Sequence, residues 1–373
     1  MTSTISGSPS VVDRVALARE IGESLRPEVP ERDRTGEISV AAFDLLRSSG
    51  LSAALVPVEF GGGGATHTEM GAILRELGRH DPSTAVAFAM HSHLVAAQVW
   101  RHKHGVDASA VFAKVAAGAI LVSTGASDWV DSTGAAERVE GGYRVSARKA
   151  PASGCEVGDV LVTSVRFGAE VLHCAIPMSA PGVRIEQTWD AFGLRASGSH
   201  TVVLEEVFVP DAAVSMIRPV GVWPPVLNVV IGAALPLVLS AYLGVADAAV
   251  EVTARLLAGR GEAHTAQSAG EMVNAYTTAA DLIAAMFADA ADLMFANTDE
   301  YAARTLSRKT VAADALITTV RLAIETTGGA GYSRACELER LYRDIHGCQF
   351  HPLPRAKQTR FSGRVLLGHS PLG

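Results

Sequence analysis

Apolar residues recur at helical spacing through the first third of the chain. The spacing predicts helices over residues 11–25, 38–49, 66–80 and 83–102. Gly50 directly follows the second of these helices, where a glycine commonly ends a helix. These segments predict a helical N-terminal domain over residues 1–118.

From residue 119 onward the apolar period changes from that of a helix to that of strands. Short runs rich in β-branched residues alternate with turns such as Gly141-Gly142 and Pro181-Gly182. The runs predict strands over residues 120–122, 143–146, 160–163, 171–176, 201–204 and 207–209. They indicate a small central β domain over residues 119–215.

Long apolar helices are predicted for the remainder of the chain, over residues 226–257, 266–297 and 299–327. They indicate a C-terminal helical bundle over residues 216–373. Because helices, strands and helices follow one another in separate blocks, we expect an α+β fold rather than an alternating α/β fold. No Gly-x-Gly-x-x-Gly motif follows a predicted strand, so a Rossmann nucleotide site is not expected.

One segment is long and apolar enough to cross a membrane. Residues 229–246 contain no charged side chain. However, Pro236 interrupts the run, and Ser240 and Tyr242 lie within it. We therefore expect a helix buried inside a large bundle, and no membrane association.

Composition narrows the range of partners. The chain has 373 residues, of which 48% are hydrophobic, and a net charge of -7. No tract of Lys or Arg interleaved with aromatic residues is present, so nucleic acid is not an expected partner. The cysteines lack Cys-x-x-Cys spacing, and the first residues lack the pattern of a signal peptide. These features favour a cytoplasmic protein with reduced thiols.

The most informative motif lies after the last long helix. Residues 327–332 read Thr-Gly-Gly-Ala-Gly-Tyr, and an Arg343-Asp344 pair follows. Glycine lets a chain turn with positive φ and approach a phosphate closely, because it has no Cβ. Together these residues resemble the C-terminal signature of the acyl-CoA dehydrogenase flavoprotein superfamily. The resemblance extends over nearly the whole chain, with the domains in the same order.

The resemblance implies the acyl-CoA dehydrogenase fold: an N-terminal α-helical domain, a small central β-barrel or sandwich domain and a C-terminal four-helix bundle. It also implies a flavin, FAD or FMN, between the β domain and the bundle, and assembly as a homotetramer through the bundle. In the family the glycine turn approaches the FAD diphosphate of a neighbouring subunit. Gly328, Gly329 and Gly331 are therefore candidate cofactor-binding residues.

Hydroxyl groups mark two further flavin motifs. Residues 123–128 read Ser-Thr-Gly-Ala-Ser-Asp and resemble the family loop that donates hydrogen bonds to the edge of the flavin ring. The resemblance makes Ser123, Thr124 and Ser127 candidate flavin contacts, and it leaves open which of the first two faces the ring. Ser153 matches the family hydroxyl that meets flavin N5. The alternative for both segments is an ordinary polar turn or hairpin.

The residues expected around the adenosine half of FAD depart from the family pattern. Arg260 is the best candidate for the family arginine that reaches the FAD of another subunit, and Glu325 replaces a glutamine before the glycine turn. A carboxylate facing a diphosphate is unfavourable. These departures fit a weakly held cofactor, either FMN or transiently bound reduced FAD.

The usual catalytic base is missing from its expected places. Fatty acyl-CoA dehydrogenases use a glutamate to remove the substrate α-proton, and the resemblance puts its two sites near Pro352 and near Ala234 or Leu235. None of these side chains accepts a proton. His351, one residue before the first site, instead resembles the histidine-containing tail of the reduced-flavin monooxygenases, such as dibenzothiophene monooxygenase.

Those monooxygenases also place a histidine over the flavin from an N-terminal helix, and the matching helix here carries His91 and His93. Being two residues apart, they point to different helix faces, and Leu94 favours His93 as the inward one. His351 and His93 are therefore the candidate catalytic residues, which would protonate or hydrogen-bond oxygen activated by the flavin. The alternatives are structural histidines or a metal site, and the latter lacks a nearby acidic ligand.

The sequence favours a two-component monooxygenase, in which a separate flavin reductase supplies reduced flavin and O2 oxygenates a small organic substrate. Two alternatives remain open. One is an acyl-CoA or acyl-carrier-protein dehydrogenase with a relocated base, for which Asp247 and Glu251 are the first suspects. The other is a catalytically silent scaffold subunit that assembles with an active relative.

Overall fold

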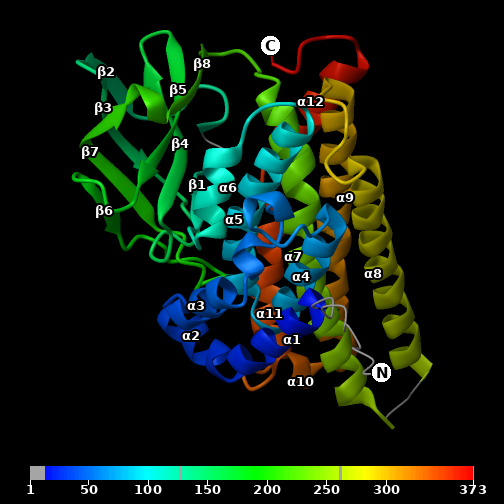
Figure 1. Cartoon of the computed structure of the whole chain (residues 1–373). Coiled ribbons are helices and arrows are strands. Elements are labelled where there is room, and N and C mark those ends of the chain that lie inside the picture. The colour runs from blue at the N-terminus through cyan, green and yellow to red at the C-terminus, as the bar shows by residue number, and fades with distance from the viewer. Residues whose placement is uncertain (1–12, 126–127, 260–262, 373) are drawn as a thin grey trace, which may run out of the picture.

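The computed structural model describes residues 13–125, 128–259 and 263–372. Helices from the N- and C-terminal parts of the chain pack into one helical body, and the β domain lies against its side (Figure 1). The predicted order of helices, strands and helices is confirmed.

The N-terminal part is helical, as the apolar spacing predicts. Its helices are α1 (Arg14–Leu25), α2 (Val29–Thr35), α3 (Val40–Ser48), α4 (His67–His80), α5 (Pro82–Lys103) and α6 (Ser109–Ala116). The Asp81 carboxylate caps α5 by accepting from the amide of Thr84, and Pro82 occupies the first helical position. The spacing does not predict α2 and α6, because helices of so few turns show little periodicity.

The central domain consists of short strands arranged in two sheets. Its strands are β1 (Leu121–Ser123), β2 (Ala135–Val139), β3 (Gly142–Lys149), β4 (Val160–Phe167), β5 (Glu170–Pro177), β6 (Val183–Glu186), β7 (Thr201–Pro210) and β8 (Val214–Pro219). In the described residues they form two four-stranded sheets, with orders β1-β4-β5-β8 and β2-β3-β7-β6. β1 pairs with β4 in parallel, and the other pairs are antiparallel. Val145, Leu161 and Val202 belong to the core of this domain.

The sheets differ from the predicted strands in three ways. The runs at 201–204 and 207–209 form the single strand β7. A bulge, with Glu206 at φ 52°, joins them and lets the strand continue where the apolar pattern is interrupted. β8 pairs with β5 as far as Pro219, so the sheet continues past residue 215. The pattern does not reveal β2, β6 and β8, which lie at sheet edges and have mixed exposure.

The C-terminal part is a bundle of long helices with a short helical segment packed across it. Its helices are α7 (Val226–Leu257), α8 (Ala263–Ala290), α9 (Asp299–Thr327), α10 (Gly329–Tyr332), α11 (Glu337–Ile345) and α12 (Arg355–Leu366). α7 and α9 have the predicted bounds. α8 ends earlier than predicted, because Ala291, Asp292 and Leu293 all have positive φ and turn the chain.

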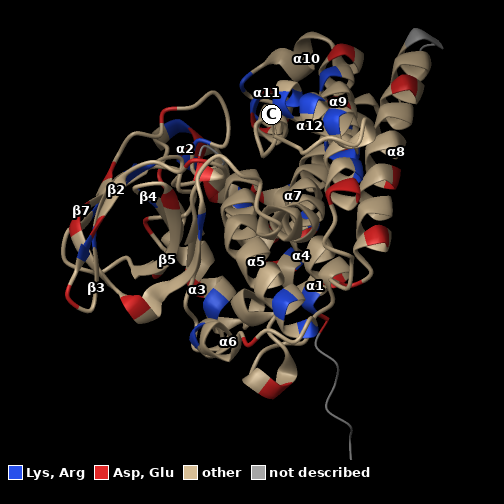
Figure 2. Cartoon of the chain, turned by 90° about the horizontal axis from the view of Figure 1, so that it is seen from above, with Lys and Arg blue, Asp and Glu red and all other residues tan. Residues whose placement is uncertain are grey.

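The apolar helix α7 is the centre of the helical body. Figure 2 shows it inside the molecule, with α4, α5 and α9 around it. The helix is long and apolar enough to cross a membrane, but 94% of its most apolar window is buried by the rest of the chain. These contacts make α7 the core helix of the bundle.

α4 and α7 cross at a pair of glycines. A Cβ added at Gly244 would lie 2.0 Å from the carbonyl oxygen of Arg75, and one at Gly78 would lie 2.1 Å from that of Ala241. The two backbones therefore approach as closely as glycine permits. This contact fixes the position of α7, other residues of which line the site described below.

Alanine at the crossing should destabilise the protein. We expect Gly244→Ala to lower the free energy of unfolding by about 1–3 kcal/mol, the usual effect of overpacking, as measured by chemical denaturation. Gly270 in α8 has open space at its Cβ position, so Gly270→Ala should raise the free energy of unfolding by up to about 1 kcal/mol. Equal effects of the two substitutions would contradict the close crossing.

Candidate active site

A cavity of about 460 Å³ lies where the β domain meets the helical body. Its walls come from the loop after β1, from α5 and α7, and from residues 346–353, which follow α11 and are called the tail below. The volume is typical of sites for cofactors and small molecules. The cavity brings together these residues predicted from the sequence: Ser123, Thr124, Ser153, His93 and His351.

α7 supplies the longest wall of the cavity. Val230, Ala234, Val238 and Tyr242 follow one another at every fourth position and therefore share one face of the helix. At 1.5 Å per residue this face extends over about 18 Å. The face is apolar until it reaches the hydroxyl group of Tyr242.

The tail places His351 against Tyr242. Nε2 of His351 lies 2.7 Å from the Tyr242 hydroxyl, within hydrogen-bond distance, and the ring centroids are 5.4 Å apart. Burial, together with smaller effects of the nearby Lys309 and His93, lowers the pKa of His351 to about 3. Burial likewise raises the pKa of Tyr242. Both side chains are therefore neutral at physiological pH.

Tyr242 is a site residue that the sequence patterns miss. It is fully buried in an apolar helix, where a tyrosine usually serves as part of the core. The sequence signal for Tyr242 is its spacing of four residues from Val238, which places both side chains on one face of the helix. This spacing identifies Tyr242 as a site residue only once the packing shows which face of α7 borders the cavity.

The two histidines of α5 lie on different sides of the helix, as their spacing requires. His93 lines the cavity, and its Nδ1 lies 3.1 Å from the carbonyl oxygen of Ala89. His91 is bound instead to the carbonyl oxygen of Ser52 (2.8 Å) and to the amide of Leu121 (2.9 Å). Burial lowers the pKa of both histidines to about 4. His91 therefore ties α5 to β1, and His93 faces the site.

The β domain contributes hydroxyl groups to the cavity wall. The Ser199 hydroxyl donates to Ser153 (2.8 Å) and lies 2.6 Å from the Ser197 hydroxyl, and all three serines line the cavity. Thr124 lies 3.2 Å from the hydroxyl of Thr163. Ser197 and Ser199 are missing from the sequence-based candidates, because neither flavin motif recognised in the sequence includes them.

A buried ion pair holds the loop that follows Ser123. Nζ of Lys149 lies 2.8 Å from the carboxylate of Asp128, and it donates to the carbonyl oxygens of Thr133 (2.8 Å) and Ser164 (2.5 Å). Lys149 is 1% exposed. Breaking such a pair leaves a buried charge without a partner, which costs about 3–5 kcal/mol. The pair therefore fixes the loop that carries the predicted flavin contacts.

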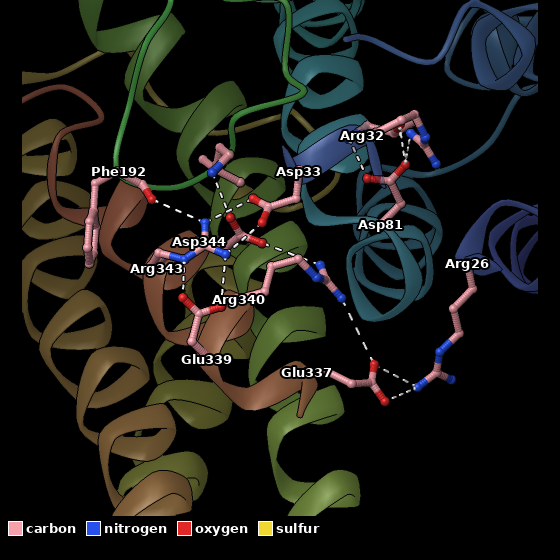
Figure 3. A network of polar contacts seen from close by, with 12 residues as sticks. Arg26, Arg32, Asp33, Asp81, Phe192, Glu337, Glu339, Arg340, Arg343 and Asp344 are labelled. Carbon is pink, nitrogen blue, oxygen red and sulfur yellow. Dashed lines mark hydrogen bonds and ion pairs between the residues drawn. The ribbon is translucent and has the colours of Figure 1, made fainter. Parts of the chain in front are cut away.

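Charged residues at the end of α11 join the three parts of the chain beside the cavity (Figure 3). Arg343 binds the carboxylate of Asp33 in α2 (2.6 Å) and donates to the carbonyl oxygen of Phe192 (3.3 Å). Asp344 is 2% exposed and accepts from the amide of Leu194 (2.6 Å). Burial raises the pKa of Asp344 to about 6.

No Asp or Glu is found among the described residues that line the cavity. Asp247 and Glu251, the suspects for a relocated base, are bound to α4: Asp247 to Arg75 (2.6 Å) and Glu251 to Arg79 (2.5 Å). The described part of the chain contains no group of three or more His, Cys, Asp and Glu residues placed to hold a metal. The described walls therefore offer imidazole and hydroxyl groups for proton transfer, and no carboxylate.

The predicted glycine turn does not line the cavity. Gly328, with φ 61°, ends α9, and Gly329 and Gly331 lie in α10. None of these three is among the cavity-lining residues. Ser127 and Arg260 fall outside the described residues. The glycine turn stays a predicted contact for a flavin held by another copy of the chain.

Two stretches of the chain, one in each helical part, match models of known protein families. Residues 14–117 match the acyl-CoA dehydrogenase N-terminal domain, and residues 235–350 match the acyl-CoA dehydrogenase C-terminal domain. The chain belongs to the acyl-CoA dehydrogenase family. Both matched stretches contribute to the cavity, the first through α5 and the second through half of the α7 wall and the start of the tail.

Monooxygenases are found among its relatives. Amino sugar nitrososynthase DnmZ of Streptomyces peucetius is 27% identical, over 92% of this chain and 90% of its own. Dibenzothiophene monooxygenase of Rhodococcus erythropolis is 30% identical, over 53% of this chain and 50% of its own. The structure of KijD3 with FMN and a dTDP-linked amino sugar has a TM-score of 0.86 at 25% identity, covering 97% of this chain and 94% of KijD3. The predicted resemblance to flavin-dependent monooxygenases of this fold is confirmed.

The buried neutral histidines predict a loss of stability at mildly acidic pH. Burial lowers the pKa from 6.5 to about 4 for His67, His91, His93 and His173, and to about 3 for His351. Between these values and 6.5 the unfolded chain binds protons that the folded chain excludes. The free energy of unfolding should therefore fall as the pH is lowered from about 6.5 towards 5. Asp344 has the opposite effect, but it is a single group.

Chemical denaturation of the flavin-free protein at pH 7 and pH 5 measures this dependence. His91→Gln removes one titrating group and should make the dependence shallower, because glutamine binds no proton in this range. A free energy of unfolding that is equal or higher at pH 5 would contradict the burial of these histidines in neutral form.

Proposed function

We propose that the protein is a two-component flavin-dependent monooxygenase, which uses reduced flavin and O2 to oxygenate a small, neutral, apolar molecule. The observation that carries the proposal is the contact between neutral His351 and Tyr242 in a cavity whose described walls hold no carboxylate. The monooxygenases among the relatives support the same function.

The cavity walls suit a flavin ring. Ser123, Thr124 and Ser153 present hydroxyl groups on the β-domain side. Such donors stabilise the negative charge that collects at the ring edge on reduction, and a neighbouring carboxylate would oppose it. When bound, reduced flavin would supply the electrons that activate O2.

His351 and Tyr242 together keep a polar hydrogen available at the cavity wall. When the Tyr242 hydroxyl donates to Nε2, the Nδ1–H group of His351 is free to donate; when Nε2–H donates, the Tyr242 hydroxyl is free. Either arrangement can hydrogen-bond an oxygen atom beside the apolar face of α7. Because both groups are neutral, they bring no unpaired charge into the cavity.

Acyl-CoA dehydrogenation has less support from the geometry. That reaction needs a base within a few ångströms of the substrate α-carbon. The family positions for the base correspond to Ala234, Leu235 and Pro352, which line the cavity without a group that accepts a proton. Asp247 and Glu251 are held in ion pairs with α4.

The walls also favour a neutral substrate. Val230, Ala234 and Val238 form an apolar surface, and Trp129 lines the cavity while packing on Trp223 just before α7, with ring centroids 6.2 Å apart. A protonated amine would find no carboxylate partner on the described walls, and burial of an unpaired charge is strongly unfavourable. The expected substrates are therefore closer to an uncharged ring compound such as dibenzothiophene than to an amino sugar.

The proposal includes partners. A separate reductase would supply reduced FMN or FAD, and the chain would act as a cytoplasmic homotetramer assembled through its bundle. In that assembly Gly328, Gly329, Gly331 and Arg260 of one copy would contact the flavin held by another, and Ser127 would contact the flavin of its own copy.

Replacing His351 by phenylalanine should keep flavin binding and uncouple the reaction. We expect product formation to fall by roughly 10²–10⁴-fold, the usual contribution of a positioned acid or base, with hydrogen peroxide released instead. Tyr242→Phe should cause a smaller loss, because His351 remains. His102→Gln, on α5 but not lining the cavity, is the matched control and should stay coupled. Full coupling in both His351→Phe and His93→Phe would contradict the oxygenase assignment.

Acyl-CoA substrates should leave the flavin oxidised. We expect no bleaching when flavin-loaded protein is mixed anaerobically with a panel of acyl-CoAs, because the described cavity walls provide no carboxylate base. Rapid bleaching would favour the dehydrogenase.

Calorimetric titration with FMN and FAD tests the scaffold alternative. We expect binding of at least one cofactor, oxidised or reduced. Binding of neither would favour a scaffold subunit.

A further inference from the structure

Lys309 of α9 is buried beneath the tail. It is 1% exposed, and among the described residues no carboxylate forms an ion pair with it. Its Nζ donates to the backbone carbonyl oxygens of Gln349 (3.0 Å) and Leu353 (3.3 Å). These two carbonyl groups lie on either side of His351 in the chain. One amino group therefore binds the tail both before and after the predicted catalytic histidine.

Packing alone does not explain a lysine at this position. Methionine would fill similar space without the cost of desolvating a charge. Burial lowers the pKa of Lys309 to about 8, as expected for a cation removed from water. What the side chain provides is a set of N–H donors directed at the tail.

The tail needs such support because it has little regular structure. Its first part, His346–Gln349, is a short 3-10 helix, and residues 350–353 form neither helix nor strand. Backbone of this kind depends on contacts with the rest of the protein for its position. The contacts of the tail with the rest of the protein include the two hydrogen bonds from Lys309 and the contact of His351 itself with Tyr242.

We propose that Lys309 is a positioning residue, whose two hydrogen bonds to the tail hold His351 against Tyr242 at the cavity wall. The consequence for catalysis rests on the proposed monooxygenase function, whereas the consequence for the tail does not. Lys309 also places a positive charge near His351, which opposes protonation of the imidazole. The lysine would thus set the place of His351 and would add to the effect of burial, which keeps the imidazole neutral.

Hydrogen–deuterium exchange on the flavin-free, full-length chain tests the positioning directly. In Lys309→Met the amides of residues 346–353 should exchange roughly ten- to a hundredfold faster, which corresponds to the loss of hydrogen bonds from a charged donor. Amides of α7 should keep their protection. Arg308→Met is the matched control, because Arg308 is the adjacent cation of α9 and pairs with Asp289 of α8 (2.6 Å). It should leave exchange in the tail unchanged.

The fraction of flavin oxidation that yields product shows whether Lys309 positions His351 or only stabilises the fold. Lys309→Met should keep its flavin affinity yet release hydrogen peroxide in place of product, and Lys309→Arg, which keeps charged donors, should recover much of the coupling. Should Lys309→Met fail to fold, Lys309→Gln takes its place. Glutamine keeps N–H donors without a charge, so coupling and tail exchange in Lys309→Gln should lie between those of the wild type and those expected for Lys309→Met. Tail exchange equal to that of the wild type would overturn the proposal, as would faster exchange with full coupling. A wild-type protein that oxygenates nothing would overturn the proposed function and leave the exchange result standing.

Discussion

The adjacent residues Arg343 and Asp344 at the end of α11 connect all the parts of the chain that enclose the cavity. Arg343 reaches Asp33 of the N-terminal helices and the Phe192 carbonyl of the β-domain segment, and Asp344 accepts from the amide of Leu194 (2.6 Å). Charge-assisted hydrogen bonds are among the stronger polar contacts in proteins, and the one from Leu194 to Asp344 is also buried. The tail begins two residues after Asp344, so the same contacts determine where the tail enters the cavity.

The chemical character of the site follows from the desolvation of its walls. Apolar surroundings lower the pKa of His93 to about 4 and that of His351 to about 3. Both rings are therefore neutral at physiological pH. Neutral imidazole and hydroxyl groups can hydrogen-bond oxygen without introducing a charge. Removal of a proton from carbon needs a base held beside the substrate, and the described walls contain no carboxylate for that role. The geometry therefore supports oxygenation over desaturation.

Apolar periodicity predicts most of the fold, and motifs predict part of the site. The long helices α7 and α9 have the predicted bounds, whereas the edge strands β2, β6 and β8 lack a clear alternation. Ser123, Ser153 and His351 are recognisable because they stand in motifs, and the structure brings them to one cavity. Tyr242 and Lys309 are not recognisable, because their roles depend on which helix face meets the tail. That information arises from contacts between residues far apart in the sequence.

The central claim is that this cavity supports transfer of oxygen from O2 to a neutral organic molecule. Its most direct test uses isotopically heavy O2, with reduced FMN and a panel of uncharged heteroaromatic compounds, and mass spectrometry of the products. We predict a product that carries one heavy oxygen atom, formed by the wild-type protein and largely lost in His351→Phe. Product without heavy oxygen, or reduction of the bound flavin by an acyl-CoA in the absence of O2, would contradict oxygen transfer as the function of this site.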